Sequence, residues 1–135
     1  EHSEFNNSMS EPVHFVQIWI FPNESQLEPR YDQQLIPSDI SNKFSQILSP
    51  DPNDEGVWIH QQAWMNLGKF TEDTITEFKI HETNHGLYIF MLEGEAEVAE
   101  QHLGKRDAIG LWDTTSFSIN AKKGAEILTI EVPMK

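Results

Sequence analysis

A histidine and a glutamate two residues apart, His2 and Glu4, stand at the start of the sequence. In an extended segment both side chains lie on the same side, because side chains alternate across a strand. An imidazole and a carboxylate together suit non-haem iron and similar divalent ions. Two ligands alone do not hold a metal tightly, so a site here would need further ligands from residues before Glu1 or from another chain. The alternative is a frayed chain end that happens to carry both residues.

Composition limits the partners and the compartment. The 135 residues suffice for one domain with a real core, and 22 acidic against 9 basic residues give a formal net charge of −13. We therefore expect neither nucleic acid nor an anionic membrane as a partner, because both require clustered basic residues. The absence of Cys excludes disulfides, a thiol nucleophile and Cys-ligated zinc. No apolar run reaches the ~18 residues of a membrane span, and no signal pattern opens the chain, so we expect a soluble, cytoplasmic protein.

The first residue is not Met, from which we expect a processed product or a piece cut from a longer protein. The hydrophobic pattern of that piece is typical of β-strands. The apolar run 13–21 reads as one strand ended by Pro22, and the polar residues 23–32 read as a connector. From residue 57 onward, about seven short apolar or alternating runs are separated by turn residues. This spacing predicts a sandwich or barrel, and the succession of hairpins favours a closed or rolled antiparallel barrel with few free edges.

Several other polar residues have structural interpretations. His81 and His85 are four residues apart, but they fall in a loop and at a strand start, so they do not face one another as they would on a helix. We interpret them as a structural or surface pair. The acidic residues between Glu93 and Glu100 alternate with apolar ones, which suits an outward strand face and not a calcium loop. The tryptophans, Trp64 among them, are interpreted as core residues.

A set of positions in the second half of the chain resembles a cupin, a jelly-roll barrel whose two motifs usually hold a metal: the run 87–98 with Gly94, then Asp107, Ile109 and Ala121. The first cupin motif, G-x5-H-x-H-x3,4-E-x6-G, anchored on Gly94, places its histidines at His81 and Thr83 and its glutamate at Leu87. The second motif, G-x5-P-x-G-x2-H-x3-N, places its histidine at Phe117. Three of the four ligands are thus replaced. The resemblance therefore implies a cupin that has lost its metal site, and we expect no cofactor in this barrel.

The N-terminal stretch narrows the resemblance from cupins in general to one family of cupins. Its residues 2–6 (HSEFN), Glu11, 17–20 (QIWI) with Pro22, and 29–31 (PRY) with Gln33 resemble the middle of a pirin. Pirins are two-cupin proteins, and bacterial members include quercetin 2,3-dioxygenases. In that family the metal lies in the N-terminal cupin, bound by two histidines of one motif and a His-x-Glu of the next. His2 and Glu4 match the His-x-Glu pair, whereas the first two histidines have no counterpart, because the chain begins after them.

The resemblance implies an all-β chain in three parts. Residues 1–22 form an arm matching the end of the family's N-terminal cupin, residues 23–44 form a connector, and residues 45–135 form a C-terminal cupin (jelly-roll) antiparallel β-barrel without metal ligands. Detached from the N-terminal cupin, the arm would expose the apolar run Ile18 to Phe21 as a sticky edge. We therefore expect the arm to pack on its own barrel or to pair two chains into a homodimer.

The resemblance also implies a chemistry. The family mechanism is metal-assisted oxygenation, in which an iron or similar divalent ion holds an ionised flavonol oxygen and steers its reaction with O2. The parent protein is expected to be an oxygenase of the quercetin 2,3-dioxygenase type that acts on a small aromatic substrate. This chain alone is expected to be catalytically silent and to need the N-terminal cupin domain as its partner. The alternative is a non-catalytic cupin module that binds a small ligand or a protein in a regulatory or assembly role.

Overall fold

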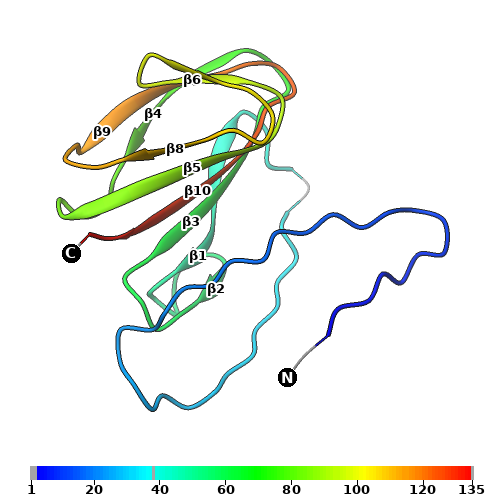
Figure 1. Cartoon of the computed structure of the whole chain (residues 1–135), viewed down its shortest axis with the longest axis vertical. Coiled ribbons are helices and arrows are strands. Elements are labelled where there is room, and N and C mark those ends of the chain that lie inside the picture. The colour runs from blue at the N-terminus through cyan, green and yellow to red at the C-terminus, as the bar shows by residue number, and fades with distance from the viewer. Residues whose placement is uncertain (1–2, 38, 135) are drawn as a thin grey trace.

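The computed structural model describes residues 3–37 and 39–134 (Figure 1). This part of the chain contains strands and no helix, and therefore no helix that could cross a membrane. The strands are β1 (Lys43–Ser49), β2 (Val57–Trp58), β3 (Trp64–Lys69), β4 (Thr74–Lys79), β5 (His85–Glu93), β6 (Ala96–Val98), β7 (Gln101–Leu103), β8 (Ala108–Leu111), β9 (Ser116–Ala121) and β10 (Glu126–Pro133). The all-β class predicted from the alternating pattern is confirmed.

The strands form two facing sheets. One has six strands in the order β2-β1-β3-β10-β5-β8, and the other has four in the order β4-β9-β6-β7. All pairings are antiparallel except that of β1 with β2. The expected closure is not seen, because the ladders of the described residues do not join the two sheets into one barrel. Two of the four edge strands, β2 and β7, have only two and three residues, which offer few backbone groups for a continuous ladder.

The hydrophobic core lies between the sheets. Along β5, the inward positions Leu87, Ile89 and Met91 are nearly inaccessible to solvent, and Ile127 of β10 lies beside them. The four-stranded sheet adds Ile119 and other side chains to the same cluster. Each such side chain contributes about 1.5–3 kcal/mol through burial. Because side chains alternate along a strand, the inner face of β10 continues from Ile127 through residue 129 to residue 131.

The arm departs from the sequence prediction, because residues 13–21 form no strand. This segment lines a groove together with the outer-face residues Met65, Leu67 and Leu128 of the six-stranded sheet. A sheet face offers side chains but no free backbone edge, so the arm cannot extend the ladder there. Two hydrogen bonds hold the end of the arm: the Asn23 N–H donates to the His60 carbonyl (2.8 Å), and the Gln61 amide donates to the Phe21 carbonyl (2.9 Å).

The aromatic residues of the arm remain exposed despite this contact. Trp19 and Phe21 are 81% and 83% exposed, and Trp112 of the barrel is 61% exposed. The interpretation of the tryptophans as core residues is therefore wrong for Trp19 and Trp112. It is confirmed for Trp64, which is 8% exposed. An exposed aromatic group of this size on a segment that packs only loosely is typical of a surface that another domain or chain covers.

An exposed ion pair beside the β5–β6 turn gives a pH-dependent prediction. The Lys105 ammonium donates a hydrogen bond to Glu93 at 2.8 Å, and this bond lowers the pKa of the Glu93 carboxyl, with smaller help from the charges of Lys105, Arg106 and His14. A carboxyl whose pKa is lowered by folding stabilises the fold above its unfolded-state pKa, and this contribution is lost as the pH falls through the lowered value.

Replacing Lys105 by methionine should raise the pKa of Glu93 toward its ordinary value. Carbon-detected NMR of the side-chain carboxyl, followed through an acid titration, measures that change. Lys79→Met alters the net charge equally but leaves this pair intact, and should leave the titration of Glu93 nearly unchanged. An unaltered Glu93 titration in Lys105→Met would contradict the assignment.

Candidate functional site

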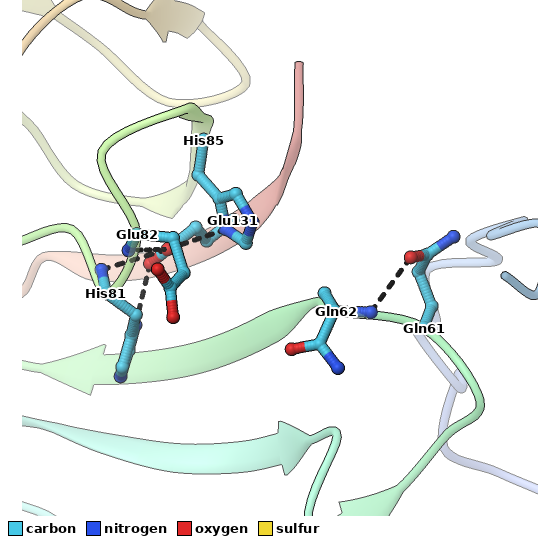
Figure 2. A network of polar contacts seen from close by, with 6 residues as sticks. All are labelled: Gln61, Gln62, His81, Glu82, His85 and Glu131. Atoms are coloured by element: carbon cyan, nitrogen blue, oxygen red, sulfur yellow. Dashed lines mark hydrogen bonds and ion pairs between the residues drawn. The ribbon is translucent and has the colours of Figure 1, made fainter. Parts of the chain in front are cut away.

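A polar cluster at the margin of the core is built on Glu131 of β10, whose side chain is fully buried. One carboxylate oxygen, Oε2, lies 2.7 Å from Nδ1 of His81, and the other, Oε1, lies 3.0 Å from Nδ1 of His85 (Figure 2). The backbone N–H groups of His81 (2.9 Å) and Glu82 (3.4 Å) also donate to Oε1. Within the described residues, the ion-pair partners of Glu131 are these two histidines. Two backbone N–H groups therefore donate to this carboxylate, and both histidine rings lie where they can donate to it through Nδ1.

The sheet brings these residues together from distant parts of the sequence. Glu131 lies on the inner face of β10, directly across from Trp64 of β3 and Leu87 of β5. His85 begins β5, and His81 lies in the loop between β4 and β5. The Trp64 indole stacks on the His81 ring, with 4.4 Å between centroids and 7° between planes. Aromatic packing and the carboxylate together fix the plane of the His81 imidazole.

The shared carboxylate favours the same tautomer for both histidines. Each Nδ1 lies within hydrogen-bond distance of a Glu131 oxygen, and the tautomer with its hydrogen on Nδ1 lets each ring donate to that oxygen. In the neutral ring this leaves Nε2 as a hydrogen-bond acceptor, pointing away from Glu131. The His85 side chain is 4% exposed, whereas the His81 side chain is 39% exposed. A carboxylate behind an imidazole is the arrangement that orients histidines acting as bases or as metal ligands.

The sequence anticipated part of this cluster. It predicted that His81 and His85 form a structural or surface pair, and the structure brings both onto one carboxylate. Glu131 is the residue of this cluster that the sequence analysis did not single out. A signal for it was present, because Glu131 is four residues after Ile127 in an alternating strand and therefore shares its inward face.

The predicted metal ligand Glu4 is not part of this cluster. Glu4 is exposed, and His2 falls outside the described residues. Across residues 3–37 and 39–134, no group of three or more His, Asp or Glu side chains could hold a metal ion. The described part of the chain therefore does not contain a complete ligand set, and a site that uses Glu4 would need donors from elsewhere. The assignment of His2 and Glu4 stays a prediction.

Two of the four positions that correspond to cupin metal ligands, Leu87 and Phe117, carry apolar side chains in or against the core. Leu87 is 2% exposed within the core cluster, and Phe117 packs against that cluster. Thr83 lies exposed in the β4–β5 loop. His81, the one histidine that matches the motif, is turned toward Glu131. Hydrocarbon therefore fills the place where the motif would put a carboxylate and an imidazole.

Comparison with known proteins identifies the family of this chain. Residues 46–132, more than half of the chain, match the family described as "Quercetinase C-terminal cupin domain". The chain belongs to this family. The quercetin 2,3-dioxygenase of Escherichia coli K12 is 29% identical to this quercetinase C-terminal cupin, over 98% of the chain but 56% of that protein. A provisionally named quercetin 2,3-dioxygenase of Mycobacterium tuberculosis is 46% identical, over 99% of the chain and 55% of that protein. The chain spans about half the length of the curated relatives it matches.

Solved structures confirm the cupin fold. The bacterial pirin YhhW of E. coli, solved in complex with nickel(II), superposes with a TM-score of 0.78 over 87% of this chain and 49% of its own, at 24% identity. A quercetin 2,3-dioxygenase of Acinetobacter baumannii gives 0.58 over 67% of this chain and 30% of its own, at 21% identity. The resemblance to the pirin family, inferred from the arm and the barrel positions, is confirmed.

Proposed function

We propose that the parent of this quercetinase C-terminal cupin is a metal-dependent oxygenase of the quercetin 2,3-dioxygenase type, acting in the cytoplasm on a small aromatic substrate. The observation that carries the proposal is the match of nearly the whole chain to proteins of that name, of which it spans about half. The remaining half would contain the N-terminal cupin. This cupin would bind the metal, for which iron is our first choice. In this proposal the chain alone is catalytically silent.

The exposed residues of the arm support a parent in which the N-terminal cupin binds the metal and this chain contributes ligands to it. Its Glu4 is exposed and is therefore free to face another domain. The side chains of Phe15, Trp19 and Phe21 are 66–83% exposed, although surface aromatic groups of this size are usually buried by a partner. An N-terminal cupin seated on the arm would bury these groups and receive His2 and Glu4 as two of its metal ligands. Pairing of two isolated chains through the arm would use the same surface.

The test is turnover of quercetin under O2, measured as oxygen uptake and loss of flavonol absorbance. The intact parent, loaded with iron, nickel or copper, should turn over quercetin. Residues 1–135 alone, loaded in the same way, should not, and adding the separately prepared N-terminal half should restore activity if the halves associate. Robust turnover by the isolated chain, or none by the intact parent with any of these metals, would overturn the proposal.

A second role is favoured for this domain by its interior. Leu87 and Phe117 put hydrocarbon where a cupin motif would place metal ligands. This favours a non-catalytic module that shapes the space between the domains or binds a small ligand or protein. A parent without oxygenase activity, whose isolated C-terminal half still binds a ligand, would establish this role instead.

A further inference from the structure

Side chains of the connector cover the free edge of β2. The residue after Trp58 donates its N–H to β1, so the carbonyls of Gly56 and Trp58, two residues apart, both point to the free side. The Gln34 amide donates to the Gly56 carbonyl at 2.9 Å, and the Arg30 guanidinium donates to the Trp58 carbonyl. These bonds occupy the acceptors that a further strand would need, so the chain itself protects this edge.

Among the edge strands in the described part of the chain, β8 has no such protection. β7 has only three residues, and β4 carries exposed charges at Glu77 and Lys79, which are two common ways in which proteins protect an edge. β8 has the uncharged sequence Ala-Ile-Gly-Leu and lies at the margin of the six-stranded sheet, beside β5 (Figure 1). Its residues Ala108 and Gly110 are exposed.

The backbone groups of Ala108 and Gly110 point away from β5. Met91 of β5 exchanges hydrogen bonds with the turn that leads into β8, so its N–H and carbonyl face β8. By alternation Ile89 also faces β8, and it pairs with Ile109. The N–H and carbonyl groups of Ala108 and Gly110 are therefore directed to the open side of the sheet, where a further strand could bind them.

Exposed aromatic side chains flank this edge on the outer face of the sheet. Tyr88 lies directly across from Gly110 and is 46% exposed, and Trp112 is 61% exposed. A Cβ on Gly110 would lie 3.9 Å from the Trp112 ring, which places this ring beside the open edge. Exposed aromatic surface next to an open strand edge is typical of a protein contact.

We propose that β8 is a self-association surface, at which two copies of this chain pair their β8 strands antiparallel about a two-fold axis at Ile109. Ala108 of one copy then lies opposite Gly110 of the other, and each such pair exchanges two backbone hydrogen bonds. The six-stranded sheets of the two copies would become one continuous sheet. The inference does not rest on the oxygenase activity of the parent, and it uses a surface other than the arm.

The charges beside β8 favour a second copy in this register. Arg106 lies on the outer face, where it lines the groove beneath the arm, and it has no ion pair within the described residues. Pairing about Ile109 brings Arg106 of each copy next to the exposed Trp112 ring of the other, as a cation–π contact requires. An axis one residue further along would set Asp107 of one copy against Asp113 of the other, and like charges directly opposite are destabilising.

The contact is small, which determines the expected affinity. A pair of four-residue strands with two aromatic contacts covers less than the roughly 800 Å² per partner of a stable interface. We therefore expect a weak dimer, with a dissociation constant of about 0.1 mM.

Two measurements on residues 1–135 test the proposal. Sedimentation velocity should show a reversible monomer–dimer equilibrium between about 10 µM and 1 mM protein. Over the same range, amide exchange measured by NMR should slow at Ala108 and Gly110, but not at Glu77, whose N–H faces away from β9 at the edge of β4. A monomer throughout, or a dimer in which the two β8 amides exchange as in the monomer, would overturn the proposal. Slowing that requires the separately prepared N-terminal half would assign the edge to that domain and would overturn it too.

Matched variants locate the contact. Gly110→Pro removes an N–H that β5 does not use, so it should abolish the dimer, whereas Glu77→Pro makes the same change at the edge of β4 and should leave the dimer unchanged. Trp112→Ala should weaken dimerisation by about threefold to tenfold, and Trp19→Ala, at an exposed ring of the arm, should not. A dimer that survives Gly110→Pro and Trp112→Ala but is lost in Trp19→Ala would assign the pairing to the arm and overturn the proposal. If a variant does not fold, the amide exchange of the unmodified chain decides the question.

Discussion

Glu131→Ala should lower the free energy of unfolding by about 3–5 kcal/mol, the range found when one member of a buried charged cluster is removed. The carboxylate is fully buried and accepts from both His81 and His85 and from two backbone N–H groups. Its removal leaves these donors without their acceptor, and the missing side chain leaves a void against Trp64. Urea denaturation followed by tryptophan fluorescence measures the loss.

Glu126→Ala is the matched control, because Glu126 begins the same strand. It is partly exposed and pairs with Lys69 at 3.6 Å, so its loss should cost at most about 1 kcal/mol. If both variants lost the same small amount, the Glu131 cluster would not stabilise the fold as described. The buried cluster would then contribute no more to the free energy of unfolding than the exposed Glu126–Lys69 pair does.

Gly94→Ala should cost about 3 kcal/mol, because two separate penalties meet at this turn. Gly94 joins β5 to β6 with φ +72°, a conformation that alanine adopts only with strain. A Cβ there would lie 2.8 Å from the Ala125 Cα and from the Gly124 carbonyl oxygen, both of them backbone atoms. Backbone cannot give way as a flexible side chain can, so the β5–β6 turn and the β9–β10 turn would have to move apart.

Gly124→Ala separates the two penalties. Gly124 also has a positive φ, +88°, but a Cβ on it would meet no atom within 4 Å. Only the conformational strain of about 1–2 kcal/mol applies, and thermal or urea unfolding of the two variants should therefore differ clearly. Equal losses would mean that the close approach of the two turns at Gly94 does not affect stability.

The strands of the barrel could be predicted because their signals are local. Alternation in β5 and β10 and the turn residues between short runs define the elements without knowledge of their partners. The cupin motif assigns the position of its glutamate to Leu87, and the structure has this side chain in the core. The closed barrel that the pattern favoured is not formed by the described strands, because closure depends on the pairing of the short edge strands.

The arm and the Glu131 cluster could not be predicted, for the same physical reason. A strand requires a free edge as well as an apolar pattern, and residues 13–21 meet the face of a sheet. His81 and Glu131 are 50 positions apart in sequence, and only the finished sheet brings their atoms to 2.7 Å. A buried carboxylate is tolerated only where such partners exist, so its role cannot be read from its own segment.

Metal content per chain is the measurement that tests the central claim most directly. Elemental mass spectrometry should find near-stoichiometric metal in the intact parent, little in its Glu4→Ala variant, and nearly unchanged metal in Glu11→Ala, an exposed acidic control on the same arm. The isolated chain of residues 1–135 should bind little. This result would make the arm a donor of ligands to the N-terminal cupin. Near-stoichiometric metal in the isolated chain, or metal in the parent that survives Glu4→Ala, would contradict the account.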